Sequence, residues 1–186
     1  LGEMKEGTEF GKIMGDGCEA VGKYLGCKRI PAVKHQALAG YEPRNTKGTG
    51  ITYATSPMGA DHTAGLTMGR AFDDAGRAAQ AYASNKLQVA MCIADSMMCI
   101  FAFAHVVPVM PKLGDMMDAM YGGNYGFPRL GAMGVKTLLT ERAYNKMAGM
   151  TDADDRLPEF FYKERSVATG SVFDINDYEL EVLFDF

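Results

Sequence analysis

The chain has 186 residues, of which 47% are hydrophobic and 23% are charged. This composition is close to that of an average globular protein, so it excludes collagen, coiled coil and disorder. The net charge is −4, and because no basic stripe is visible we expect no nucleic-acid partner. Four cysteines are too few for a disulfide scaffold and have no CxxC zinc spacing, which favours a reducing, cytoplasmic compartment.

The first residue of the chain and its longest uncharged stretch are each informative. The chain begins at Leu1 with no signal peptide before its first helical pattern, so we expect it to be a piece of a longer polypeptide. The longest stretch without Asp, Glu, Lys or Arg is 96–111, shorter than the ~20 residues that a bilayer requires. Pro108 within it should also break a helix near Val107. We therefore expect no membrane span.

The N-terminal part combines a helix with a long loop. Apolar residues at helical spacing predict a helix over 7–26, with Thr8 as N-cap and Gly26 as C-terminal stop. Residues 27–50 are rich in Pro and Gly and predict an extended loop. Its basic or titratable side chains could contact an anion or could be solvated. They are Lys28, Arg29, Lys34, His35, Arg44 and Lys47.

Helical patterns dominate the rest of the chain. A short helical turn is expected at 51–56, and the strongest signal, apolar on nearly every face, predicts a long, buried central helix over 74–104. Shorter helices are predicted over 109–121 and 127–148.

Two capping boxes and the scarcity of strands complete the pattern. Thr151 with Asp154, and Asn176 with Glu179, have the spacing that starts a helical turn. No strand pattern exceeds about five residues. The predicted fold class is all-α, without a sequence repeat.

Few residues stand out as candidates for chemistry. His62 is flanked by glycine and alanine in MGADHTAG, so it could be either a structural histidine or a catalytic one. Cys92 and Cys99 are seven residues apart on the predicted central helix, about 10.5 Å along its axis. That distance is too long for a mutual disulfide, and both cysteines are expected to be small buried residues. We find no complete metal site, nucleotide-binding loop or serine elbow.

The segment from Leu25 to Gly65 resembles the C-terminal part of the tungsten-dependent aldehyde ferredoxin oxidoreductase family. That family has Y-D-P-R followed by K-G-x-G-x-x-Y-A-T-S-x-R-G-x-x-H, and the resemblance continues almost to the end of the chain. The corresponding segments here are Tyr41–Arg44, Lys47–Gly50, Tyr53–Ser56, Gly59–His62, ADSMMCIF at 94–101, LTERAYNKMAG at 139–149 and DDRLPEFF at 154–161.

The resemblance implies a multihelical fold in two parts. Residues 1–69 would end the middle helical domain and carry the active-site loop, and residues 70–186 would form the C-terminal helical domain. Members of the family oxidise aldehydes to carboxylic acids, using tungsten or molybdenum on two pterins beside one [4Fe–4S] cluster. Ferredoxin takes the electrons.

The resemblance also assigns roles to three residues. Cys99 matches the fourth cluster cysteine, since thiolates are the usual iron ligands, and Ile100 matches the hydrophobic residue that contacts the pterin. His62 matches the histidine beside the metal, which is thought to assist proton transfer or to orient the aldehyde. Cys92 keeps its interpretation as a core residue.

Several positions depart from the family pattern. Met58 and Ala64 stand where the family has an arginine and a lysine that help to hold the pterin phosphates or their magnesium. The run Asp95–Cys99 is one residue shorter than the family's D-S-L-G-L-C, so the aspartate's pterin contact is not carried over to Asp95.

The implied partners are the N-terminal pterin-binding and cluster-binding parts of the same polypeptide, ferredoxin and a small aldehyde. Homo-oligomerisation stays open. Without the N-terminal parts, the isolated chain is expected to hold neither cofactor and to be inactive. The alternatives are a subunit of an aromatic acyl-thioester reductase of the same family, and a non-catalytic scaffold whose site has decayed.

Overall fold

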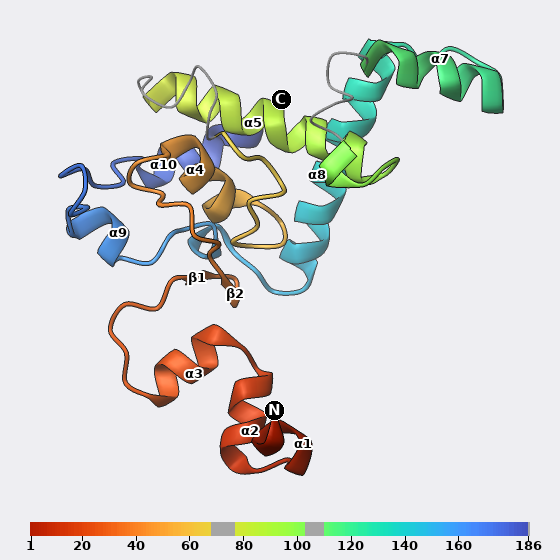
Figure 1. Cartoon of the computed structure of the whole chain (residues 1–186). Helices are drawn as coiled ribbons and strands as arrows, with labels where there is room; N and C mark the ends of the chain where they lie inside the picture. The colour runs from red at the N-terminus through yellow and green to blue at the C-terminus, as the bar shows by residue number, and fades with distance from the viewer. Residues whose placement is uncertain (68–76, 103–109, 186) are drawn as a thin grey trace.

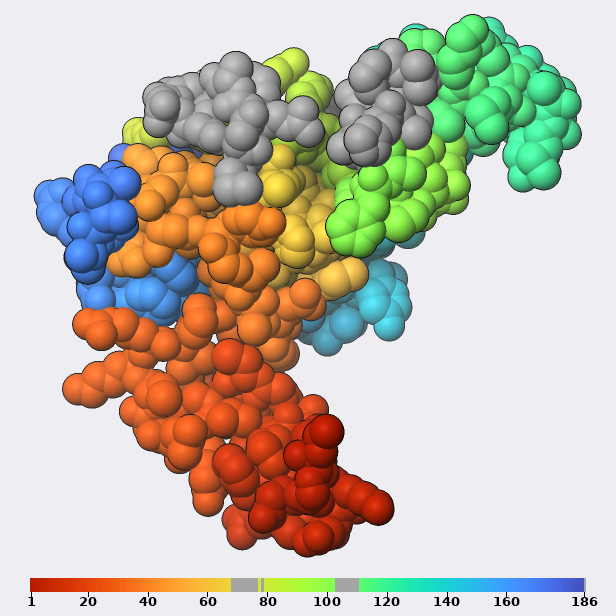
Figure 2. All heavy atoms as spheres, viewed as in Figure 1, coloured from red at the N-terminus to blue at the C-terminus, as the bar shows by residue number. Residues whose placement is uncertain are grey.

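The computed structural model describes residues 1–67, 77–102 and 110–185. Short helices form an N-terminal unit that projects from the main body (Figures 1 and 2). Their bounds are α1 Gly2–Glu6, α2 Glu9–Gly15 and α3 Cys18–Tyr24.

The predicted single helix over 7–26 is wrong in one respect: it is divided into α2 and α3. The division falls at Gly17, whose φ of +93° is incompatible with a continuous α-helix. The predicted cap is confirmed, because the Thr8 hydroxyl accepts a hydrogen bond from the N–H of Gly11 at 3.0 Å. Gly26, with φ +68°, follows the end of α3 as expected.

The predicted loop at 27–50 contains a small hairpin and the start of a helix. Strands β1 Ala32–Val33 and β2 Gln36–Ala37 pair antiparallel, with Val33 opposite Gln36. Helix α4, Lys47–Thr55, begins four residues before the predicted turn at 51–56. It is buried from Gly48 to Thr55, so packing compensates for the low helix propensity of its glycines and threonines.

Helix α5, Arg77–Asp95, packs against both α4 and α8, Phe127–Met147. The prediction of one helix over 74–104 is wrong at its C-terminal part, because α5 ends at Asp95. Residues 96–98 form a turn, and the Ser96 hydroxyl donates to the carbonyl of Cys92 at 2.8 Å. Such a bond offers the backbone an alternative to the helix. Residues 74–76 and 103–104 lie outside the described residues.

The remaining elements complete an all-α fold, which confirms the predicted class. They are α7 Met110–Tyr121, the 3-10 helices η2 Asp152–Asp154 and η3 Val182–Phe184, α9 Phe160–Lys163 and α10 Asp177–Glu181. Both predicted capping boxes are present, at Thr151 and at Asn176. The main core joins α4 to the C-terminal segments through Ile51, Tyr53, Phe173 and Leu180.

No helix within the described residues is long and apolar enough to cross a membrane.

Candidate functional site

A buried seam of polar side chains joins α4 to α5. The Thr52 hydroxyl lies 2.8 Å from the Ser84 hydroxyl and donates to the carbonyl of Gly65 at 2.8 Å. The Gln88 amide N–H donates to the Thr55 hydroxyl at 2.9 Å. Because buried polar groups need partners, this seam fixes how the loop after α4 lies against α5.

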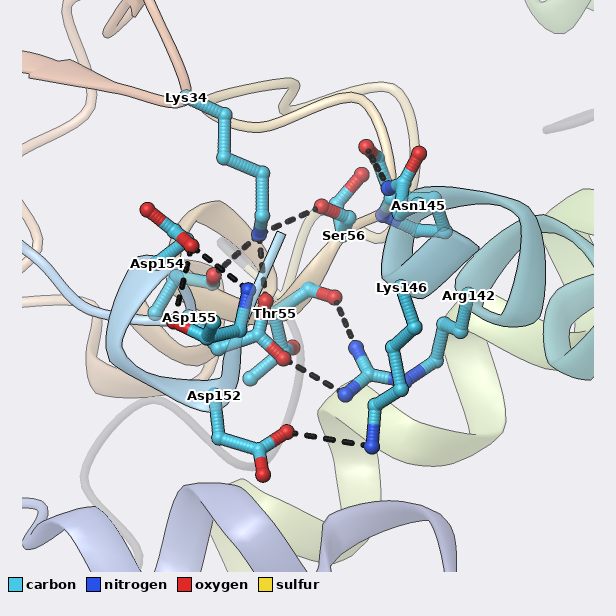
Figure 3. A network of polar contacts seen from close by, with 12 residues as sticks. Lys34, Thr55, Ser56, Arg142, Asn145, Lys146, Asp152, Asp154 and Asp155 are labelled. Carbon is cyan, nitrogen blue, oxygen red and sulfur yellow. Dashed lines mark hydrogen bonds and ion pairs between the residues drawn. The ribbon is translucent and has the colours of Figure 1, made fainter. Parts of the chain in front are cut away.

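Lys34 reaches the C-terminal end of α4 from the turn of the hairpin (Figure 3). Its Nζ donates to the carbonyls of Ala54 at 2.8 Å and Ser56 at 3.0 Å, and lies 2.6 Å from Oδ1 of Asp155. Burial lowers the pKa of the Lys34 ammonium group, against the opposing effect of Asp155. The side chain is only 3% exposed, so Asp155 is the counter-ion that makes a charged lysine tolerable there.

Arg142 of α8 approaches the same helix end from the other side (Figure 3). It donates to the carbonyl of Thr55 at 2.8 Å and to Oδ2 of Asp155 at 2.6 Å. The last carbonyls of a helix carry partial negative charge, which cations stabilise. The loop that leaves α4 is thus held at its first residues by two cations and one shared carboxylate.

The loop at 56–65 is shaped by a close approach at Gly59. This residue has φ +96°, and an added Cβ would lie 2.4 Å from the carbonyl oxygen of Val33. Beyond it, the carboxylate of Asp61 accepts hydrogen bonds from the backbone N–H and the hydroxyl of Thr63. The ring of His62 is half-buried and lies against Tyr41, with ring centroids 5.2 Å apart.

A cavity of about 690 Å³ lies where this loop, the end of α5 and the middle of α8 meet. Its volume is within the range of about 300–1,000 Å³ that is usual for small-molecule sites. Its charged lining residues are Asp61, Asp95 and Glu141, and its apolar lining residues include Pro57, Met58, Ala64, Met91, Leu138 and Tyr144.

The acidic groups around this cavity influence one another. Burial and the charge of Asp61 raise the pKa of the Asp95 carboxyl, and burial and the charge of Asp95 raise that of Glu141. The pKa of the Cys92 thiol, which also lines the cavity, rises to about 11 through burial and these two carboxylates. Cys92 is therefore a protonated thiol at neutral pH, and thiols in that form are poor nucleophiles and ligands.

None of the three predicted site residues is among those that line the cavity. His62 follows Asp61 in the chain, and the exposed Cys99 lies three residues after Ser96, which lines the cavity. Ile100 is half-buried and packs against the core cluster around Leu113 and Leu130. No glycine is among the residues that line this cavity.

The two cysteines also differ from expectation. Because α5 ends at Asp95, Cys92 and Cys99 do not share a helix face, and Cys99 is exposed, not buried. Cys92 is half-buried. Within residues 1–67, 77–102 and 110–185, no three His, Cys, Asp or Glu side chains are placed so that they could hold a metal ion.

The acidic lining is what the reasoning from sequence missed. Asp61, Asp95 and Glu141 come from three separate segments, and each lies inside a run that matched the family pattern. Met58 and Ala64, two of the departures from that pattern, line the same cavity. The cavity therefore has apolar groups where the family has cations.

The basic loop is neutralised by the chain itself. Five of its six basic or titratable groups lie within 4 Å of a carboxylate, and among them the side chains of Arg29 and His35 remain 68% and 81% exposed. The pairs are Arg29–Glu164, Lys34–Asp155, His35–Glu19, Arg44–Glu42 and Lys47–Asp174.

The fold is that of a multihelical domain, and its largest described feature for a ligand is a cavity of small-molecule size. Residues 1–184 match the family model described as aldehyde ferredoxin oxidoreductase, domains 2 and 3. The chain therefore belongs to the aldehyde ferredoxin oxidoreductase family, whose members are oxidoreductases. A comparison with curated proteins finds no match.

Proposed function

We propose that this chain is part of an enzyme that oxidises aldehydes to carboxylic acids. The observation that supports this function best is the cavity, because the His62 loop forms one wall and the end of α5, just before Cys99, forms another. The overall change is RCHO + H₂O → RCOOH + 2H⁺ + 2e⁻. Electrons would pass through a [4Fe–4S] cluster to ferredoxin in the cytoplasm.

The chemistry of the side chains fits the cofactors in part. The carboxylates of Asp95 and Glu141 are acceptors that suit the N–H groups of a pterin ring, whereas the cavity has no Lys or Arg among its described lining residues to hold the phosphates. The exposed Cys99 thiol suits one position on a cluster. The other cluster ligands and the cations for the phosphates would come from elsewhere in the polypeptide.

We assign separate roles in the reaction to the pterin, to His62 and to the lining of the cavity. A tungsten or molybdenum pterin, when bound, supplies the two-electron redox chemistry. His62, held against Tyr41, would accept the proton that water loses as it adds to the carbonyl carbon of the aldehyde. The apolar lining residues of the cavity would contact the organic part of the aldehyde.

The function is tested on the complete cofactor-loaded polypeptide under anaerobic conditions. We expect aldehyde-dependent reduction of a viologen dye. His62→Ala should leave the cluster absorbance in place and slow turnover by about 10²–10⁴-fold. Cys99→Ser should remove or destabilise the cluster, and Cys92→Ser is the matched control that should retain it.

A second candidate, a non-catalytic scaffold, is favoured by one observation. Met58 and Ala64 place apolar groups at the cavity where the family has cations. Full cluster content in both cysteine variants, together with no aldehyde-dependent dye reduction, would support this candidate and contradict the enzyme.

A further inference from the structure

The ammonium group of Lys34 is fully committed to the place where α4 passes into the loop at 56–65 (Figure 3). An ammonium group has three N–H donors, and the structure gives this one three acceptors. They are the carbonyls of Ala54 at 2.8 Å and Ser56 at 3.0 Å, and Oδ1 of Asp155 at 2.6 Å. A buried ion pair is by itself weak evidence for a stabilising role, so the two carbonyls indicate what this lysine holds.

Hydrogen bonds continue from the Ser56 carbonyl along the loop to His62. This carbonyl also accepts from the N–H of Gly59 at 3.0 Å, and the carbonyl of Gly59 accepts from the N–H of Asp61 at 2.6 Å. His62 is the next residue, and its own carbonyl accepts from the N–H of Gly65 at 3.3 Å. Because buried and half-buried backbone groups keep their partners, a displacement of the Ser56 carbonyl is passed along the loop to His62.

The segment around the hairpin contacts the same loop at two further points. A Cβ added to Gly59 would lie 2.4 Å from the carbonyl oxygen of Val33 and 3.0 Å from the Cβ of Lys34. Tyr41, which follows the hairpin, lies against the ring of His62. The loop therefore lies on residues 33–41 from its start to its histidine, and Lys34 provides the side chain that ties the two segments together.

The backbone of the hairpin turn gives a second observation that points to Lys34. Lys34 and His35 have φ values of +49° and +68°, in the left-handed region that favours glycine. Two-residue hairpin turns with such angles usually contain Asn or Gly. Strained residues of this kind persist where the surrounding contacts hold them, and they gather at functional sites. A glycine at position 34 would relieve the strain but would lose the ammonium group.

We propose that Lys34 is a positioning residue for His62: by holding the Ser56 carbonyl, it places the imidazole where it can accept the proton of the attacking water. This inference rests on the proposed function, because it takes His62 as the base. Loss of a positioning residue lowers kcat more than it changes KM, because a displaced base slows proton transfer while the substrate still binds.

The test is a double-variant cycle on the complete cofactor-loaded polypeptide. Lys34→Met keeps most of the side-chain length and leaves Asp155 paired with Arg142. It should lower kcat by about 10–100-fold and change KM by less than about threefold. In the His62→Ala background, the same substitution should lower kcat by less than about twofold, because residues that act as a unit are not additive. An unchanged kcat in Lys34→Met, or full multiplication of the two losses in the double variant, would overturn the proposal.

Hydrogen exchange gives a readout that does not depend on turnover. Lys34→Met should accelerate exchange in the peptide 56–65 by about tenfold or more, because the loop opens more often. Asn85→Ala is the matched control, since it removes another buried side-chain donor from a backbone carbonyl, that of Leu183 at 2.7 Å. It should lower Tm but leave kcat within about twofold and exchange in 56–65 unchanged. Equal exchange in the parent protein and Lys34→Met would overturn the proposal.

Two further arrangements keep the outcomes separate. If Lys34→Met does not fold, Lys34→Gln, which keeps a shorter donor, enters the same cycle with the same expectations. If the parent protein reduces no dye with any aldehyde, the proposed function is overturned instead, and hydrogen exchange then decides whether Lys34 holds the loop.

Discussion

Lys34 and Asp155 form an ion pair that is almost completely removed from solvent. Nζ lies 2.6 Å from Oδ1, and the side chains are 3% and 13% exposed. The same carboxylate also binds Arg142, so one acidic group compensates two buried cations at the end of α4.

The first prediction concerns this shared carboxylate. Asp155→Asn should lower the free energy of unfolding by about 3 kcal/mol, because it leaves two buried cations without their counter-ion. Urea denaturation measures the effect. Asp152→Asn is the matched control: its contact with Lys146 spans 3.4 Å between largely exposed side chains, so its loss should cost less than about 0.5 kcal/mol. Equal losses of unfolding free energy in the two variants would show that the buried ion pairs of Asp155 stabilise the fold no more than an exposed contact does.

The second prediction concerns the pKa values around the cavity. Folding raises the pKa of the Asp95 carboxyl, so its contribution to stability is complete below its unfolded pKa of about 3.9 and is lost as pH rises through the folded value. Asp95→Asn should therefore raise Tm at pH 7.5, and the gain should disappear as the pH approaches about 4. Thermal unfolding at both pH values is the measurement, with Asp115→Asn as the control. If the Asp95→Asn variant kept the same increase in Tm near pH 4, the raised pKa of the Asp95 carboxyl would be contradicted.

The third prediction concerns Gly59. Gly59→Ala should destabilise the fold by about 1–3 kcal/mol, since it places a Cβ at positive φ and against the Val33 carbonyl. Chemical denaturation measures this loss. Gly131→Ala changes a glycine inside α8 that has open space around its Cβ position, so it should stabilise by up to about 1 kcal/mol. If both substitutions stabilised the protein, the close contact between Gly59 and the Val33 carbonyl would be contradicted.

The fourth prediction concerns the seam between α4 and α5. Thr52→Val keeps the shape of the side chain but removes its bonds to Ser84 and Gly65, and should cost about 1–3 kcal/mol because the partners stay buried. Thr140→Val in α8, where the hydroxyl of an exposed residue bonds only to the Lys136 carbonyl among the described residues, should change stability by less than about 0.5 kcal/mol. Matching unfolding curves for the two variants would argue against the seam.

The features that local sequence could predict are those with local causes. The Thr8 cap and the capping box at Asn176 depend on residues three positions apart, and both are present. The end of α5 could not be predicted in the same way, because the apolar pattern continues on both sides of Asp95 and Ser96, where the turn lies. The resemblance led to the correct family, whereas the roles of His62 and Cys99 stay predictions. It did not reveal the acidic lining, because Asp95 and Glu141 meet only after α5 has packed on α8.

The cations at the end of α4 also constrain the order in which this chain can acquire structure during synthesis. Arg142 follows Thr55 by 87 residues, and Asp155 is made later still. Helices as short as α4 are unstable in isolation. We therefore expect α4 and the loop at 56–65 to stay unfolded on the ribosome until α8 and η2 have emerged. Ordering of this loop is then expected among the last events of folding, when the most distant contacts close.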